Sequence, residues 1–212
     1  KKARNKRRKI FMLEIKNISK KFGKHIIFQD VSLTLKEGEL IHFYGPNGSG
    51  KSTLFKIITD ITSPDKGQIK IEKGKRIGAL IENPGFIENE TILYNLKYLY
   101  SLSNTYDEKV EKHIETLCQS FHLDLYNQDK MKNYSVGMRQ KVAIIQSIME
   151  NQDIILLDEP TRGLDEAGVE EFYKLIKEYN KEKDKIIVIA SHESLKLPFD
   201  RKLVIKDYHI YD

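Results

Sequence analysis

The chain has 212 residues, of which 40% are hydrophobic and 32% charged, a balance typical of a globular protein that folds around its own core. No apolar run approaches the ~18–20 residues that a membrane-spanning helix requires, so the sequence predicts no such helix. The single cysteine, Cys118, excludes an internal disulfide framework and a cysteine-based metal site.

The net charge of +5 comes from one end of the chain. The first nine residues, KKARNKRRK, carry seven positive charges and no negative ones, so the rest of the chain is slightly acidic. We expect residues 1–11 to be a basic tail and residues 12–212 to be the folded domain. Three roles stay open for the tail: an inert extension, an arm that contacts anionic lipid, and an arm that contacts nucleic acid.

Residues 12–44 are expected to form strands, with turns at residues 22–23 and 37–38. The last of these strands, ELIHFY, is nearly all apolar and runs into a glycine-rich loop. A helix is predicted for KSTLFKIIT, and a short pair of strands near 68–72 and 76–81.

Residues from about 86 to 150 show helical spacing of apolar side chains and are expected to form a helical subdomain. From residue 153 onward the pattern alternates: strand DIILLD, helix EAGVEEFYKLIKEYN, strand KIIVIAS and two short strands. Strands that alternate with helices predict an α/β fold with a mainly parallel sheet.

The glycine-rich loop carries the strongest motif. It matches G-x-x-x-x-G-K-[ST] in full, with the required strand before it and helix after it, and comprises Gly45, Pro46, Asn47, Gly48, Ser49, Gly50, Lys51 and Ser52. Such a loop points backbone N–H groups at phosphate oxygens, assisted by the positive end of the helix dipole. We expect Lys51 to reach the β- and γ-phosphates of a nucleoside triphosphate, Ser52 to bind Mg²⁺, and Thr53 to bind the α-phosphate.

A second candidate group follows the strand at residues 154–157. Asp158 and Glu159 lie at its carboxyl end, where parallel sheets place their ligands. We expect Asp158 to hold Mg²⁺ and Glu159 to orient or deprotonate the attacking water.

Many protein families share this phosphate-binding loop (P-loop), and two further stretches indicate which family this chain resembles. NYSVGMRQKVAII precedes LLDEPTRGLD by about twenty residues, and IVIASHE with His192 follows. Together these resemble the ATP-binding subunits of ABC transporters over essentially all of residues 12–206. The family signature Leu-Ser-Gly-Gly-Gln reads Tyr134-Ser135-Val136-Gly137-Met138 in this chain.

The resemblance implies a P-loop NTPase with an N-terminal antiparallel β lobe, and two such domains packed head to tail around two ATP molecules, as a homodimer. Ser135 and Gly137 of one chain would contact the ATP held by the other, Asp165 would lie at the dimer seam, and His192 would contact the γ-phosphate. Phe22 would stack on adenine; the alternative for Phe22 is an anchor in the core.

One position departs from the family pattern. Glu82, in GALIENPGF, stands where many members have glutamine, and we expect it to contact the Mg²⁺ or the attacking water. The local pattern is similar to that of export subunits of the bacitracin-resistance and lantibiotic-immunity kind.

The resemblance also implies a partner. We expect a transmembrane permease on another chain, a location on the cytoplasmic face of the cell membrane, ATP and Mg²⁺ as cofactors, and no stable nucleic acid complex. The apolar segment from about Phe86 to Leu102 is expected to help dock the permease; packing within the helical subdomain is the alternative. The alternative function is a soluble ABC-type ATPase that acts on nucleic acid or ribosomes.

Overall fold

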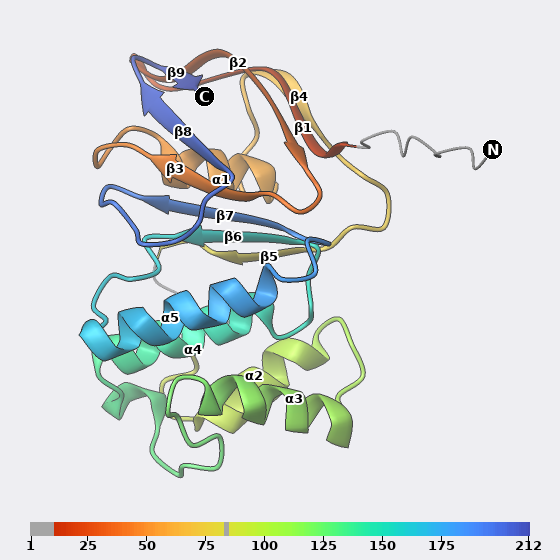
Figure 1. Ribbon diagram of the computed structural model, residues 1–212, viewed down its shortest axis with the longest axis vertical. Helices are drawn as coiled ribbons and strands as arrows, with labels where there is room; N and C mark the ends of the chain where they lie inside the picture. The colour runs from red at the N-terminus through yellow and green to blue at the C-terminus, as the bar shows by residue number, and fades with distance from the viewer. Residues whose placement is uncertain (1–10, 83–84) are drawn as a thin grey trace, which may run out of the picture.

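The computed structural model describes residues 11–82 and 85–212. The basic tail predicted for residues 1–11 lies outside the described part of the chain, except for Phe11, where β1 begins. The molecule is layered (Figure 1). A small sheet is followed by helix α1 (Lys51–Ile58), a large sheet, helices α4 (Val136–Ile148) and α5 (Glu166–Tyr179), and then helices α2 (Ile92–Ser101) and α3 (Glu108–Gln119).

The large sheet has the strand order β5-β6-β7-β3-β8-β9. Its strands are β3 (Leu40–Tyr44), β5 (Ile77–Leu80), β6 (Ile154–Asp158), β7 (Ile186–Ser191), β8 (Arg201–Lys206) and β9 (His209–Tyr211). Every pairing is parallel except that of β8 with β9. All residues of β6 and β7 are buried, which explains their continuous apolar sequences. The predicted mainly parallel core sheet is confirmed.

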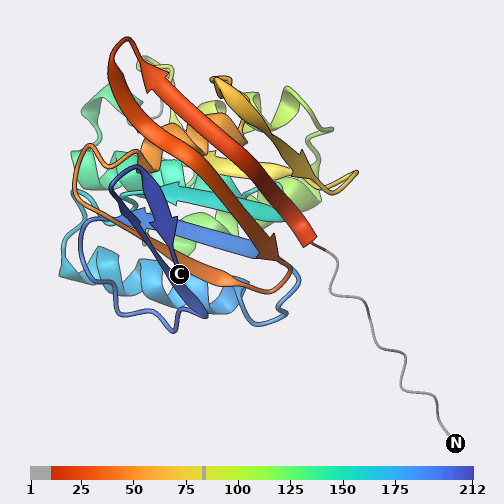
Figure 2. The same ribbon diagram turned by 90° about the horizontal axis from the view of Figure 1, so that it is seen from above.

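The small sheet is antiparallel, with the order β2-β1-β4, as the resemblance implied. It comprises β1 (Phe11–Phe22), β2 (His25–Lys36) and β4 (Lys66–Ile71). Its strands β1 and β2 cross obliquely over the large sheet (Figure 2).

The expected strand pair near 68–72 and 76–81 was wrong. Both strands exist, but β4 pairs with β1 in the small sheet, whereas β5 pairs with β6 in the large one. Gly74, at φ +87°, lies in the turn between them. Leu80 is buried in the large sheet while β4 is mostly exposed, so burial of the β5 side chains outweighs local hairpin formation.

Two apolar cores lie on opposite faces of the large sheet. Along β6, Ile154 and Leu156 belong to the core around α1 (Lys51–Ile58), whereas Ile155 and Leu157 belong to the core beneath α4 and α5 (Glu166–Tyr179). This alternation follows from the two-residue period of a strand.

Residues 86–150 contain α2 (Ile92–Ser101), α3 (Glu108–Gln119), a short 3₁₀ helix (Met131–Asn133) and α4 (Val136–Ile148). The side chains of Thr91, Asp107 and Ser135 cap the three α-helices by accepting backbone N–H bonds. Within the two described ranges, the helices are all too short or too polar to cross a lipid bilayer.

Candidate functional site

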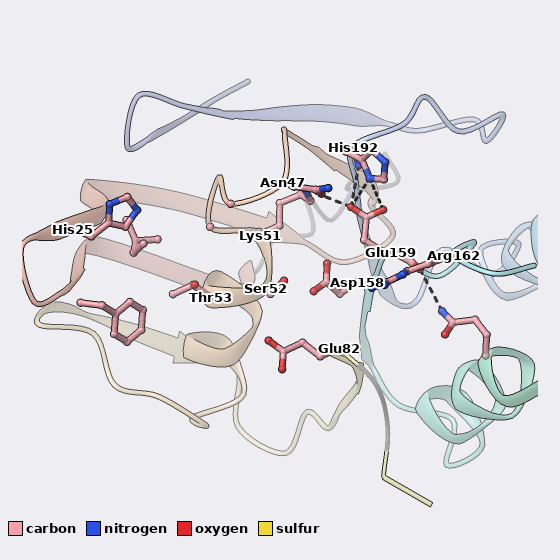
Figure 3. Close-up of a pocket in the computed structure, with 15 residues that line it drawn as sticks. His25, Asn47, Lys51, Ser52, Thr53, Glu82, Asp158, Glu159, Arg162 and His192 are labelled. Atoms are coloured by element: carbon pink, nitrogen blue, oxygen red, sulfur yellow. Dashed lines mark hydrogen bonds and ion pairs between the residues drawn. The ribbon is translucent and has the colours of Figure 1, made fainter. Parts of the chain in front are cut away.

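One pocket of about 910 Å³ gathers most of the predicted site residues (Figure 3). It lies where β3 and β6 end and α1 begins. Its lining includes eleven of the residues predicted from the sequence: Phe22, Asn47, Gly48, Gly50, Lys51, Ser52, Thr53, Glu82, Asp158, Glu159 and His192.

The glycine-rich loop has the backbone that the motif requires. Gly48 and Gly50 have φ of +80° and +105°, in the left-handed region that favours glycine. A Cβ on Gly50 would lie 2.8 Å from both Ile27 and Phe28, so β2 leaves no room for a side chain there. Gly50 immediately precedes α1, whose first N–H groups have no acceptor within the helix. The loop is therefore suited to an anionic ligand.

Lys51 turns back onto this loop. Its Nζ donates to the carbonyl oxygens of Gly45 (2.7 Å) and Pro46 (3.2 Å), and lies 3.4 Å from the Glu159 carboxylate. The side chain is nearly buried. The Lys51 ammonium group therefore lies between the glycine-rich loop and the Glu159 carboxylate at the end of β6.

Asp158 is buried, and its Oδ1 atom has no hydrogen-bond partner. Burial raises the pKa of its carboxyl, and the nearby Ser52 hydroxyl partly opposes that shift. No described group of three or more His, Cys, Asp or Glu side chains is arranged to hold a metal by itself. A buried free carboxylate oxygen beside a hydroxyl fits Mg²⁺, which uses few protein ligands and keeps several waters.

Glu159 forms the centre of a second set of contacts. Its carboxylate accepts from the backbone N–H of His192 (3.1 Å), and both of its oxygens lie 3.0 Å from His192 Nδ1 (Figure 3). Glu159 itself has φ +47°, an unusual conformation for a side-chain-bearing residue. Such conformations concentrate at functional sites.

Glu82 lines the pocket and also forms an ion pair. Its Oε1 lies 2.5 Å from Lys56 Nζ, on the first helix after the loop. Residues 83 and 84, which follow it, are outside the described residues.

Phe22 is 53% exposed, so the alternative of a core anchor was wrong. It lines the pocket, and Lys20 Nζ lies 4.9 Å from the centroid of its ring. Cys118 is buried, and burial raises the pKa of its thiol to about 12, in keeping with an inert core residue.

Ser135, Gly137 and Asp165 do not line the pocket. Ser135 caps α4, and Asp165 caps α5 by accepting from Gly168 N–H at 2.8 Å. A Cβ on Gly137 would lie 2.7 Å from the Gly163 carbonyl oxygen, so the signature segment packs closely on the loop before α5. A single chain does not bring these three residues to the phosphate loop.

The pocket also contains His25, Ile27, Gln140 and Arg162, which the sequence analysis missed. Gln140 donates to the carbonyl oxygens of Glu159 (3.3 Å) and Pro160 (3.0 Å). Its position on the helix predicted from residue 136, five residues after Ser135, was the available signal. His25 carried a weaker signal, its closeness to the Phe22 turn.

The chain is similar in sequence to known proteins over most of its length. A family model described as ABC transporter matches residues 28–162. The chain is 35% identical over 191 residues to the uncharacterized ABC transporter ATP-binding protein YdbJ of Bacillus subtilis (strain 168), with coverage of 85% of this chain and 61% of that protein. It therefore spans about three fifths of the length of YdbJ.

The chain is also 32% identical over 188 residues to the lantibiotic transport ATP-binding protein SrtF of Streptococcus pyogenes, with coverage of 85% and 80%. Among solved structures, the dimeric bacterial ABC transporter cassette MJ0796 superposes with a TM-score of 0.83 at 28% identity, covering 95% of this chain and 97% of that one. A post-hydrolysis dimer of MJ0796 bound to ADP and Pi gives a TM-score of 0.82 at 27% identity, with the same coverage.

Proposed function

This chain belongs to the ABC transporter family, and we propose that it binds and hydrolyses ATP to drive transport. One observation carries the proposal: a single pocket joins the glycine-rich loop and Lys51 to the Glu159–His192 pair. A loop that only bound an anion would not need an oriented carboxylate beside it.

In the proposed complex, the N–H groups of the loop and the start of α1 bind the β- and γ-phosphates, and Thr53 binds the α-phosphate. Lys51 exchanges the Gly45 and Pro46 carbonyls for phosphate oxygens. Phe22 is proposed to stack on the adenine, because it is an exposed aromatic side chain that lines the pocket.

Ser52 and Asp158 would hold Mg²⁺, with Glu82 close enough to the pocket to contribute. The metal, when bound, neutralises charge on the phosphate oxygens. The unpartnered Asp158 oxygen supports this assignment.

Glu159 is the proposed general base: it accepts the proton of the water that attacks the γ-phosphate. His192 holds the carboxylate in place through its Nδ1 and backbone N–H, and contacts the γ-phosphate. The two side chains are thus proposed to act as one unit.

We place the second half of the site on another copy of the chain, packed head to tail. Ser135, Gly137 and Asp165 lie outside the pocket, and Val136 between them is 73% exposed. The start of α4 would supply N–H donors and a positive dipole end to the γ-phosphate held by the partner. Loss of that phosphate would loosen the dimer.

A separate transmembrane permease would receive this motion at the cytoplasmic face of the membrane. The segment proposed to dock it keeps several apolar side chains exposed, namely Ile87, Tyr94, Tyr98 and Leu102. Phe86, Ile92 and Leu96 of the same segment are buried, so they pack within this chain instead. Export is favoured over import by the resemblance to bacitracin-resistance and lantibiotic-immunity subunits.

The proposal is tested by steady-state ATP hydrolysis and ATP binding. Glu159→Gln should keep ATP binding but lower turnover by about 10²-fold or more, since it removes the base. Lys51→Ala should weaken both binding and turnover. Wild-type turnover in either variant would reject the assigned roles.

A further inference from the structure

His42 is a buried histidine outside the pocket, in the middle of β3. Its Nε2 lies 3.0 Å from Ser191 Oγ, and its ring stacks on Phe199 with the ring centroids 4.7 Å apart and the planes at 17°. Ser191 ends β7 and Phe199 lies just before β8. His42 therefore contacts Ser191 and Phe199, which lie at the two ends of the segment that carries His192.

The hydrogen bonds fix the tautomer of His42. The Ser191 hydroxyl donates its single hydrogen to the Glu193 carbonyl oxygen at 2.6 Å, because a carbonyl can only accept. Toward His42 the hydroxyl must then accept. Nε2 of His42 consequently carries the proton and donates it.

Both polar groups of the peptide that joins Ser191 to His192 are hydrogen-bonded. Its carbonyl oxygen accepts from Gly45 N–H, at the start of the glycine-rich loop, at 3.4 Å. The next N–H, that of His192, donates to the Glu159 carboxylate at 3.1 Å. A shift of the Ser191 side chain would thus move the peptide that meets the catalytic carboxylate.

We propose that His42 is a positioning residue for ATP hydrolysis: its Nε2–H···Ser191 bond and its stacking on Phe199 hold His192 against Glu159. The proposal rests on the proposed function, since it concerns the same reaction. It adds a buried residue, three positions before the glycine-rich loop, to the groups that set the geometry of the attacking water.

The charge state of His42 agrees with this role. Burial lowers the pKa of the imidazole to about 4, with Lys202 and Lys51 acting in the same direction and Glu159 against it. The ring is therefore neutral at physiological pH, as the Nε2–H tautomer requires.

The test compares turnover with ATP affinity. His42→Phe keeps the stacked ring but removes the donor, and Ser191→Ala removes the acceptor. We expect each to lower kcat about tenfold through misplacement of His192, while the Kd for ATP stays within about twofold. Ser191→Thr, which keeps the hydroxyl, should retain kcat. The double variant should be no slower than either single one, since both changes break one bond.

His113→Phe is the matched control, because His113 is exposed on α3 and should not affect kcat. Unchanged kcat in His42→Phe and Ser191→Ala would overturn the proposal. So would an equal loss in Ser191→Thr, which would indicate a packing effect.

A second measurement does not need any variant to fold. Nitrogen chemical shifts of the wild-type imidazole should show His42 as the neutral Nε2–H tautomer, and the Nδ1–H tautomer or a charged ring would overturn the proposal. A wild-type chain that binds ATP without hydrolysing it would refute the proposed function, whereas the His42 tautomer would remain measurable.

Discussion

At the scale of one residue, Asp158 shows how a proposed metal ligand lowers the stability of the fold. Its carboxylate is buried with one oxygen unpartnered, and burial raises its pKa, with Ser52 opposing the shift. A raised pKa in the folded state means that ionisation destabilises the fold as the pH rises through the unfolded-state pKa toward the folded one. At neutral pH that cost is fully present.

Asp158→Asn should therefore stabilise the nucleotide-free protein by about 1 kcal/mol at neutral pH, while metal-dependent ATP hydrolysis is lost. The gain should shrink as the pH falls through the range where Asp158 takes up its proton. Urea unfolding as a function of pH measures both effects.

Asp153 provides a control, because its pKa is shifted down whereas that of Asp158 is shifted up. Burial acts to raise its pKa, but hydrogen bonds from the Arg76 N–H and the Lys75 ammonium outweigh it and lower the pKa. Asp153→Asn should be destabilised at neutral pH and less so in acid. Destabilisation of Asp158→Asn at neutral pH would show that the carboxylate is satisfied after all.

Lys56 offsets the negative charge that Glu82 brings to the proposed phosphate site. The pair is 2.5 Å apart and partly exposed, so it contributes modestly. Lys56→Met should raise the Kd for ATP about fivefold, the effect of ~1 kcal/mol, because it leaves the Glu82 carboxylate uncompensated. In a Glu82→Gln background the same change should have little effect; an equal loss there would show that Lys56 acts on the nucleotide directly.

At the scale of elements, Gly78 sets the distance between β5 and α4. A Cβ at this position would lie 1.9 Å from the Ser147 carbonyl oxygen, a backbone atom that cannot move alone. Gly78→Ala should lower the free energy of unfolding by about 3 kcal/mol through overpacking. Denaturant midpoints measure this loss.

Gly74→Ala is the matched control, since Gly74 has φ +87° and open space around it. It should cost only about 1 kcal/mol, the penalty of a left-handed alanine. If the two variants lost equal stability, backbone conformation rather than the contact with α4 would account for Gly78.

The sequence predicted the elements near the loop well, because strong local signals define them. The motif at residues 45–52 fixes the strand, loop and helix order, and the apolar run at 154–157 defines β6. The partners of β4 and β5 were mispredicted because pairing depends on contacts with β1 and β6, far away in the sequence. Gln140 and His42 were missed for the same reason: only the fold brings them to the site region.

At the scale of the whole molecule, the proposed ATP site is divided between two surfaces. The pocket holds the phosphate loop and Glu159, while Ser135, Gly137 and the exposed Val136 lie elsewhere on the same chain. Head-to-tail packing of two copies would bring the two surfaces together twice. This arrangement would make the closed dimer depend on bound ATP.

The central claim is tested most directly by the sedimentation of Glu159→Gln with and without ATP and Mg²⁺. We predict a monomer without nucleotide and a dimer at saturating ATP. Adding Val136→Arg should restore the monomer without changing the Kd of the single chain for ATP, since Val136 does not line the pocket. A Glu159→Gln chain that demonstrably binds ATP yet sediments as a monomer would contradict the account.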